Sequence, residues 1–231
     1  MAVCRPLGVP TCTNCVRDNQ PKYRQMRKEQ RKLARQQGAL QGLPAVLIVC
    51  EGRETEPNYI EGLCAHLGVN SAAVKVVRGE SVTHPVGLVH RAQQLFTSDG
   101  AYDLVYVVCD GDAPRLAEAR QLARKALRNL ARERTQVQVV ASSPCFEFWL
   151  LLHFEYSGRP YRTAAEATDA LRRHVTDYAK NDRNVFAKVS VGLDAACQNA
   201  DRLKAELKRT GAQVPDTDLR SLVDQLARMR K

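Results

Sequence analysis

Residues 104–114, LVYVVCDGDAP, decide the fold. The apolar run is typical of a strand buried on both faces, and such a core does not accept an unpaired charge. Asp110 and Asp112 are therefore expected at the mouth of the strand, where the chain leaves the sheet. Residues i and i+2 of an extended segment point the same way, so the two carboxylates can face one divalent cation. A solvated Asp-Gly turn is the alternative interpretation.

Segments of alternating type surround this strand, which is expected over residues 103–109. The pattern predicts three further strands and three helices, namely strands at 45–50, 74–78 and 136–140 and helices at 57–67, 85–97 and 114–133. Apolar strands separated by helices indicate an α/β fold with a parallel sheet flanked by helices. In such sheets functional side chains gather at the carboxyl ends of the strands.

The last third of the chain predicts C-terminal helices that complete the body. Thr163 and Glu166 have the spacing of a capping box at a helix start. Apolar residues recur at helical spacing over 192–209 and again over 219–226.

The first strand runs into CEGRETEPNY, which holds three glutamates within six residues. Thr55 is a candidate cap for the helix that Pro57 begins. Acids are favoured at a helix N-terminus, which accounts for Glu54 or Glu56 but poorly for Glu51 at the strand end. If this strand neighbours the one at 103–109, Glu51 joins the two aspartates at one edge of the sheet. Carboxylate oxygens in that arrangement suit Mg²⁺ or Mn²⁺.

The string SSPCFEFWLLLHF, residues 142–154, predicts a helix packed on the sheet, starting at Ser143 and Pro144. Its apolar stripe recurs at i, i+3, i+4 and i+7 and consists of Phe146, Trp149, Leu150 and His153. Glu147 lies beside this stripe, where an acid is costly without a partner or a metal. His153 is interpreted as a core histidine with satisfied hydrogen bonds, and Trp149 as a packing residue rather than a platform for a base.

The charge of the chain is concentrated in its first 44 residues. These carry nine Lys and Arg residues against Asp18 and Glu29, so they supply +7 of the net +10. Residues 22–41 favour a helix charged nearly all round, and we expect residues 1–44 to form a basic N-terminal arm and 45–231 the body. The arm's candidate contacts to nucleic acid are Arg24, Arg27, Lys28, Arg31, Lys32 and Arg35. Packing on a partner, or a solvated helix without a role, are the alternatives.

The cysteines and the hydropathy indicate a cytoplasmic protein with no membrane segment. Cys50, Cys109 and Cys145 lie in or beside apolar runs, as reduced, buried thiols do. The sequence has no apolar run of 18 residues and no signal segment. Cys12 and Cys15 form a CxxC with Cys4 upstream, but no second CxxC or closely spaced His pair follows to supply a fourth zinc ligand, so the sequence leaves zinc binding open.

Four strings together resemble the RloB family of Toprim-like bacterial defence proteins: LIVCEGRETEPNYIEGL, VVCDGD, SSPCFEFWLLLHF and the Tyr-x-Lys of Tyr178 and Lys180. The resemblance covers about residues 45–205. The chain departs from the family pattern at Ser143, where asparagine is expected, and at Gly111, where a basic residue is frequent. Both departures concern substrate contacts more than metal binding.

The resemblance implies a metal-dependent nuclease in antiphage defence and abortive infection, working on DNA or RNA, possibly tRNA, with an ATPase partner. Glu51 would be a metal ligand or general base, and Asp110 and Asp112 would hold the same metal. Glu56 would help to hold a second ion. The remaining implied roles are an outer acid at Glu147 and a transition-state lysine at Lys180. Apart from the resemblance, the polar segment 179–186 suggests that Lys180 and Arg183 face one cleft, where Arg183 would contact nucleic acid, and an exposed loop is the alternative. A homo-oligomer is also possible.

Two functions from other classes remain open from the sequence. The protein could be a non-cleaving subunit that binds nucleic acid or docks a partner, with the arm as its working part. The Asp-x-Asp of residues 110–112 also occurs in glycosyltransferases, an interpretation that Glu51 at the first strand exit weakens.

Overall fold

The computed structural model describes the body of the chain, at residues 44–79, 84–99, 102–125, 127–128 and 134–230. The predictions for the N-terminal arm and its cysteines lie outside these residues. They concern Arg24, Arg27, Lys28, Arg31, Lys32, Arg35, Cys4, Cys12 and Cys15.

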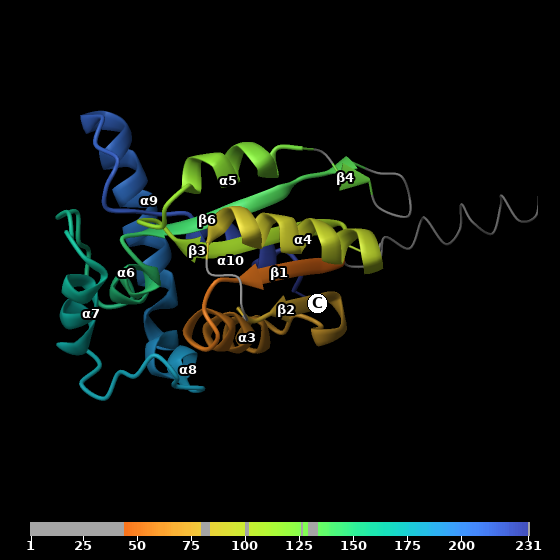
Figure 1. Cartoon of the computed structure of the whole chain (residues 1–231). Coiled ribbons are helices and arrows are strands. Elements are labelled where there is room, and N and C mark those ends of the chain that lie inside the picture. The colour runs from red at the N-terminus through yellow and green to blue at the C-terminus, as the bar shows by residue number, and fades with distance from the viewer. Residues whose placement is uncertain (1–43, 80–83, 100–101, 126, 129–133, 231) are drawn as a thin grey trace, which may run out of the picture. The chain divides into compact units, whose positions relative to one another are not determined.

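The body is an α/β fold built on a mostly parallel five-stranded sheet, as the sequence predicts (Figure 1). The strand order is β2-β1-β3-β6-β7, and β7 alone runs antiparallel to its neighbour. The strands are β1 (Val46–Cys50), β2 (Val74–Val77), β3 (Leu104–Asp110), β6 (Val137–Ser143) and β7 (Asp216–Thr217). The expected neighbourhood of the first strand and the 103–109 strand is confirmed, because β1 and β3 pair directly.

Helices cover both faces of the sheet. They are α3 (Thr55–Leu67), α4 (Pro85–Asp99), α5 (Leu116–Ala123), α6 (Phe146–Leu151), α7 (Ala164–Arg172), α8 (Val185–Val189), α9 (Leu193–Thr210) and α10 (Leu219–Ala227), with short 3-10 turns at Ser71–Ala73 and Ser190–Gly192. Alternate side chains of a strand point to opposite faces. Leu47 and Val49 accordingly pack with α4 and α5, whereas Ile48 and Cys50 pack with α3, α6, α9 and α10.

The long helix predicted over 114–133 is wrong. Helix α5 ends at Ala123, and the chain then forms a hairpin of β4 (Leu127–Arg128) and β5 (Arg134–Thr135). The Thr135 hydroxyl donates a hydrogen bond of 2.7 Å to the Asp103 carbonyl, beside the start of β3. The pairing of β4 with β5 and this contact are tertiary interactions that a helix over the segment could not make, and they outweigh its helix propensity.

Two helix starts also differ from the prediction. Helix α3 begins at Thr55 rather than Pro57, and the Thr55 hydroxyl does not cap it but donates to the Lys180 carbonyl at 2.5 Å. Helix α6 begins at Phe146, with Cys145 as its N-cap, so Ser143 and Pro144 precede the helix. The prediction at Thr163 is confirmed, since its side chain accepts from the Glu166 N–H.

The buried aromatic cluster under α3 confirms the structural interpretation of Trp149 and His153. Trp149 is fully buried and cannot stack on a base. The Nδ1 of His153 lies 3.1 Å from the Trp149 carbonyl, which can only accept, so Nδ1–H donates and Nε2 accepts from the Tyr59 hydroxyl at 3.0 Å. Burial lowers the pKa of His153 to about 4, and the ring is neutral at physiological pH.

No helix in the described part of the chain combines the length and the apolar character needed to cross a bilayer.

Candidate active site

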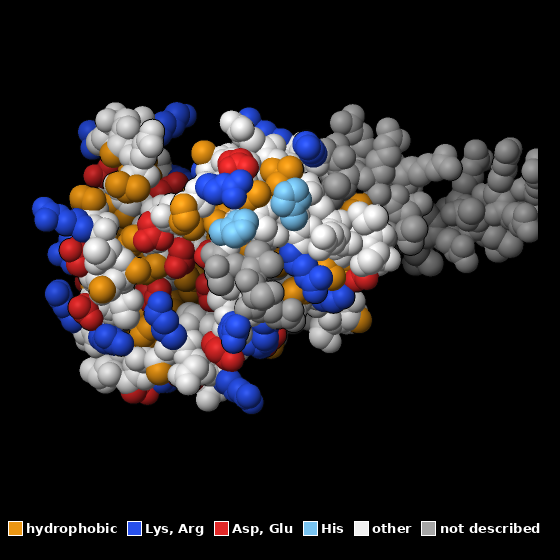
Figure 2. Space-filling model, viewed as in Figure 1, with side chains coloured by type: hydrophobic (Ala, Val, Ile, Leu, Met, Phe, Trp, Pro, Cys, Tyr) orange, Lys and Arg blue, Asp and Glu red, His pale blue; other side chains and the backbone are white. Residues whose placement is uncertain are grey.

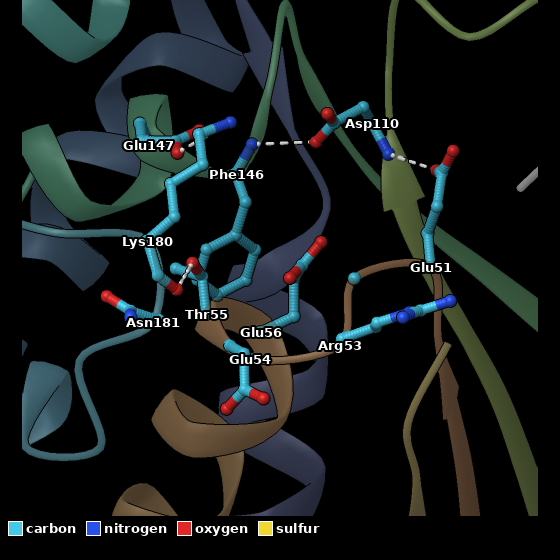
Figure 3. A pocket seen from close by; sticks show the side chains of 11 residues that line it. Glu51, Arg53, Glu54, Thr55, Glu56, Asp110, Phe146, Glu147, Lys180 and Asn181 are labelled. Carbon is cyan, nitrogen blue, oxygen red and sulfur yellow. Dashed lines mark hydrogen bonds and ion pairs between the residues drawn. The ribbon is translucent and has the colours of Figure 1, made fainter. Parts of the chain in front are cut away.

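A pocket of about 330 Å³ opens at the carboxyl ends of the central strands (Figure 3). Since β1 pairs with β3 and β3 with β6, the segments that follow these strands meet at one edge of the sheet. Figure 2 shows acidic side chains gathered in a hollow on this side of the molecule, with Lys and Arg side chains around it. The pocket is lined by Glu51, Gly52, Arg53, Glu54, Thr55, Glu56, Asp110, Phe146, Glu147, Lys180 and Asn181.

Backbone hydrogen bonds fix two carboxylates at the strand ends. The Asp110 N–H donates to Glu51 Oε2 at 3.1 Å, and the Phe146 N–H donates to Asp110 Oδ1 at 2.9 Å. The ends of β1 and β3 and the start of α6 are thus tied together through carboxylate oxygens (Figure 3). Each of these carboxylates keeps one oxygen that makes no such bond.

Glu56 reaches the pocket from the first turn of α3 and is 7% exposed. Its carboxylate lies against Gly52, where an added Cβ would collide with it. A side chain at position 52 would therefore displace the Glu56 carboxylate from its present place. Glu54 comes from the same turn, but its carboxylate points away from Glu56 and Asp110 (Figure 3).

Glu147 and Lys180 form the opposite wall. Glu147 is 3% exposed, and its Oε1 lies 3.3 Å from Lys180 Nζ and accepts a 2.9 Å bond from the Tyr178 hydroxyl. Tyr178 remains a neutral donor because burial and the Glu147 charge raise its pKa. The Lys180 ammonium is thereby held over the acidic pocket.

Burial and mutual repulsion perturb the acids of the pocket. Burial, followed by the charges of Glu56 and Glu147, raises the pKa of Asp110 to about 8. Burial also raises the pKa of Glu51 and Glu56 above the usual range. For Glu147 burial acts in the same direction, but hydrogen bonding from Cys145 and the Lys180 charge outweigh it and lower the pKa. Charges that repel one another in a buried site are typical of a functional cluster.

The structure does not bring every predicted site residue into this pocket. Glu51, Glu56, Asp110, Glu147 and Lys180 line it. Asp112 is exposed and outside the lining, since β3 ends at Asp110 and the chain then turns. Arg183 lines a neighbouring pocket.

The donor set fits a hard divalent cation, because the acids that surround the pocket offer only carboxylate oxygen. In the described part of the chain, no three His, Cys, Asp or Glu side chains lie close enough together to hold a metal as arranged here. The Mg²⁺ or Mn²⁺ assignment stays a prediction.

Thr55 and the hydrogen-bonding role of Tyr178 were missed from the sequence. The Thr55 hydroxyl donates to the carbonyl of Lys180, which lies 125 residues further along the chain. No local sequence pattern indicates so distant a partner. The Tyr-x-Lys string drew attention to Tyr178 by resemblance only, while its contact with Glu147 depends on how α6 and the 178–180 segment pack.

The two departures from the family pattern are in direct contact. The Gly111 N–H donates to the Ser142 carbonyl at 2.7 Å, and an added Cβ at Gly111 would meet the Ser143 hydroxyl and lie 2.8 Å from its backbone. A side chain at position 111 therefore requires the backbone before Pro144 to move, so Ser143 and Gly111 form one local difference.

We expect Gly111→Ala to lower the free energy of unfolding by about 1–3 kcal/mol, the typical cost of overpacking. Denaturant unfolding of the variant and the wild type measures the change. Gly68→Ala is a matched comparison in which strain arises from positive φ alone, since no atom lies near its added Cβ. An unchanged unfolding midpoint for Gly111→Ala would show that the contact is easily relaxed.

The fold and the pocket define an α/β protein with an acidic site at the carboxyl ends of parallel strands, consistent with a Toprim-like core. The family model described as RloB-like protein matches residues 46–226 of the 231-residue chain. The chain therefore belongs to the RloB-like family, which confirms the resemblance inferred from its motifs. Comparison with curated proteins and with solved structures finds no match in either set.

Proposed function

We propose that the protein is a divalent-metal-dependent nuclease that hydrolyses phosphodiester bonds in DNA or RNA. The observation that carries the proposal is the convergence of four acids, Glu51, Glu56, Asp110 and Glu147, with one lysine in the pocket at the strand ends. A buried excess of carboxylates favours cations, and a lysine at its rim favours a phosphate beside them.

Two residues would hold the metal most directly. Glu51 and Asp110 each have an oxygen that is free of the backbone bonds fixing them, and Glu56 and Glu147 lie on either side. When bound, Mg²⁺ or Mn²⁺ would supply Lewis acidity toward a phosphoryl oxygen and would lower the pKa of a bound water. A carboxylate of the pocket that is not bound to the ion would accept the proton of the attacking water.

Lys180 would stabilise the negative charge that grows on the phosphoryl oxygens in the transition state. Its contact with Glu147 keeps the ammonium at the pocket before substrate arrives. Because Glu147 is also hydrogen-bonded by Tyr178, the pair is placed in advance, which lowers the cost of reorganisation during the reaction.

Thr55 would position Lys180 through the backbone. We expect Thr55→Val, which keeps the shape but removes the donor to the Lys180 carbonyl, to lower kcat about tenfold with a smaller change in KM. Thr55→Ser retains a hydroxyl and should restore most of the rate. Equal rates in wild type and Thr55→Val would remove Thr55 from the mechanism.

The resemblance to defence proteins supports the wider setting of the proposal. We place the nuclease in the cytoplasm, in antiphage defence, with an ATPase partner that licenses its activity. The rival is a subunit that binds nucleic acid or a partner without cleaving, with the basic N-terminal arm as the working part. It is favoured by the charge of residues 1–44, which supply +7 of the net +10.

The test is cleavage of labelled DNA and RNA pools with Mg²⁺ or Mn²⁺, with and without an ATPase encoded nearby. We expect metal-dependent cleavage by the wild type and a loss of at least about a thousandfold in Glu51→Gln and Asp110→Asn. Deletion of residues 1–41 should leave cleavage of short substrates intact. Loss of nucleic-acid binding on that deletion, with no cleavage by any protein, supports the docking subunit instead.

A further inference from the structure

A second pocket, of about 440 Å³, adjoins the acidic site and shares Glu54 with it. It is formed by the first turns of α3, the residue after β2 and the segment before α8. Its lining consists of Glu54, Asn58, Glu61, Arg78 and Arg183, which we call the side pocket. In Figure 3 the Glu54 carboxylate points away from Asp110, and Glu54 lines both pockets.

Hydrogen bonds hold one wall of the side pocket in place. Arg78 donates from Nη1 to Asn58 Oδ1 at 2.9 Å and to the Arg53 carbonyl at 3.0 Å, and from Nη2 to Glu61 Oε2 at 2.7 Å. Its Nη1 also lies 3.7 Å from Glu54 Oε2. A guanidinium with these partners is fixed in orientation and largely neutralised.

Arg183 on the other side is available for a ligand. Within the described residues its side chain makes no hydrogen bond or ion pair. The backbone before Arg183 is anchored at Asp182. Asn58 Nδ2 donates to the Asp182 carbonyl at 3.2 Å, and Lys188 binds the Asp182 carboxylate at 2.7 Å. The pocket thus presents a free guanidinium on an anchored segment.

The balance of charge indicates what the side pocket binds. Arg78 is already bonded to Asn58 and Glu61 and lies 3.7 Å from Glu54, so Arg183 supplies the donors that remain for a ligand. A phosphate would lie beside the Glu54 carboxylate, whereas a neutral planar group that accepts from Arg183 and donates to Glu54 avoids that repulsion. A nucleobase has that chemistry and fits the volume.

We propose that the side pocket binds the base of a nucleotide next to the scissile phosphate and gives the site a base preference. The inference rests on the proposed function for the place of the phosphate, but base binding itself does not. Lys180 and Arg183 are three residues apart on one segment held to α3 by Thr55 and Asn58, and they enter adjacent pockets. A strand with its phosphate at Lys180 would bring a neighbouring base to Arg183.

The test measures binding of fluorescein-labelled tetranucleotides, each of a single base, to the full chain in EDTA at low salt. We expect at least a tenfold preference for one base in the wild type and loss of that preference in Arg183→Met. Arg173→Met removes an exposed arginine on a separate helix terminus and should bind as the wild type does. Arg183→Lys, with thermal melting of every variant, shows whether charge alone suffices and whether the variants are folded.

Equal affinity for all four tetranucleotides, or no binding of any, overturns the proposal, as does an unchanged preference in folded Arg183→Met. Inorganic phosphate that competes as strongly as a nucleoside identifies a phosphate site and also overturns it. EDTA prevents metal-dependent cleavage, so binding is measured independently of the nuclease proposal. A base preference in a protein that cuts nothing in the Mg²⁺ or Mn²⁺ cleavage assay would refute the nuclease and keep the side pocket. Cleavage without any base preference at the cut sites would do the reverse.

Discussion

Asp110→Asn should make the protein more stable while it removes the activity. Burial and the charges of Glu56 and Glu147 raise the pKa of Asp110 from 3.8 to about 8, so the ionised carboxylate is unfavourable in the folded state. Asparagine has no charge, and its carbonyl oxygen can still accept from the Phe146 N–H. We expect a gain of about 2–4 kcal/mol in the free energy of unfolding at pH 7, and a Tm about 5–10 °C higher.

The pH dependence gives the sign of this effect. The folded protein retains a proton on Asp110 between about pH 4 and 8, where the unfolded chain has released it. The stability due to this proton is complete below about pH 4 and is lost as the pH rises toward 8. The advantage of Asp110→Asn over wild type should therefore grow from pH 5 to pH 8. Asp112→Asn, at an exposed position, should change stability by less than about 0.5 kcal/mol.

These values come from metal-free unfolding in EDTA, monitored by circular dichroism at several pH values. A Tm of Asp110→Asn equal to or below that of the wild type at pH 8 would contradict the account of a repulsive acidic cluster.

The second large effect is acid destabilisation through His153. Burial lowers the pKa of His153 from 6.5 to about 4. The unfolded chain therefore binds a proton on this histidine below about pH 6.5, whereas the folded protein does so only below about pH 4. Stability is lost as the pH falls through this window, by about 3 kcal/mol in total. His153→Gln cannot titrate and should lose correspondingly less stability between pH 7 and pH 4.

The urea-unfolding free energies of the wild type and His153→Gln at pH 7, 5 and 4 measure the difference. Because the two proteins share every other titratable group, the difference between them removes the contribution of those groups to the pH dependence. Removal of the Tyr59 contact should cost the variant about 1–2 kcal/mol at pH 7. If both proteins lose stability equally on acidification, His153 is not the buried group that senses pH.

The sheet and the edge that carries the acidic pocket were predictable because they depend on local pattern. Continuous apolar strands bounded by acids specify a parallel sheet with charges at its mouth, and Glu51 and Asp110 lie there. The prediction that Asp112 faces the same point as Asp110 requires an extended chain. Strand β3 ends at Asp110, and Asp112 lies outside the pocket lining. The Gly111 N–H instead bonds the Ser142 carbonyl and turns the chain.

Features that depend on distant partners could not be predicted. Residues 114–133 have a composition that suits one long helix. The chain instead forms the β4–β5 hairpin after α5, and Thr135 contacts Asp103. The placement of Lys180 depends on Thr55 and Tyr178, whose partners are set by packing of α3, α6 and the 178–182 segment. Composition also gave no sign of the side pocket, because its opposite charges cancel.

The central claim is that the acids at the strand ends form a divalent-metal site. Its most direct test is a titration with Mn²⁺, in which electron paramagnetic resonance measures the binding. The proteins compared are the wild type, Glu51→Gln, Asp110→Asn and the exposed control Asp169→Asn. We predict that the first two variants bind Mn²⁺ at least about tenfold more weakly than wild type, while Asp169→Asn is unchanged. Equal affinity in all four proteins, or no binding by the wild type, would contradict the claim.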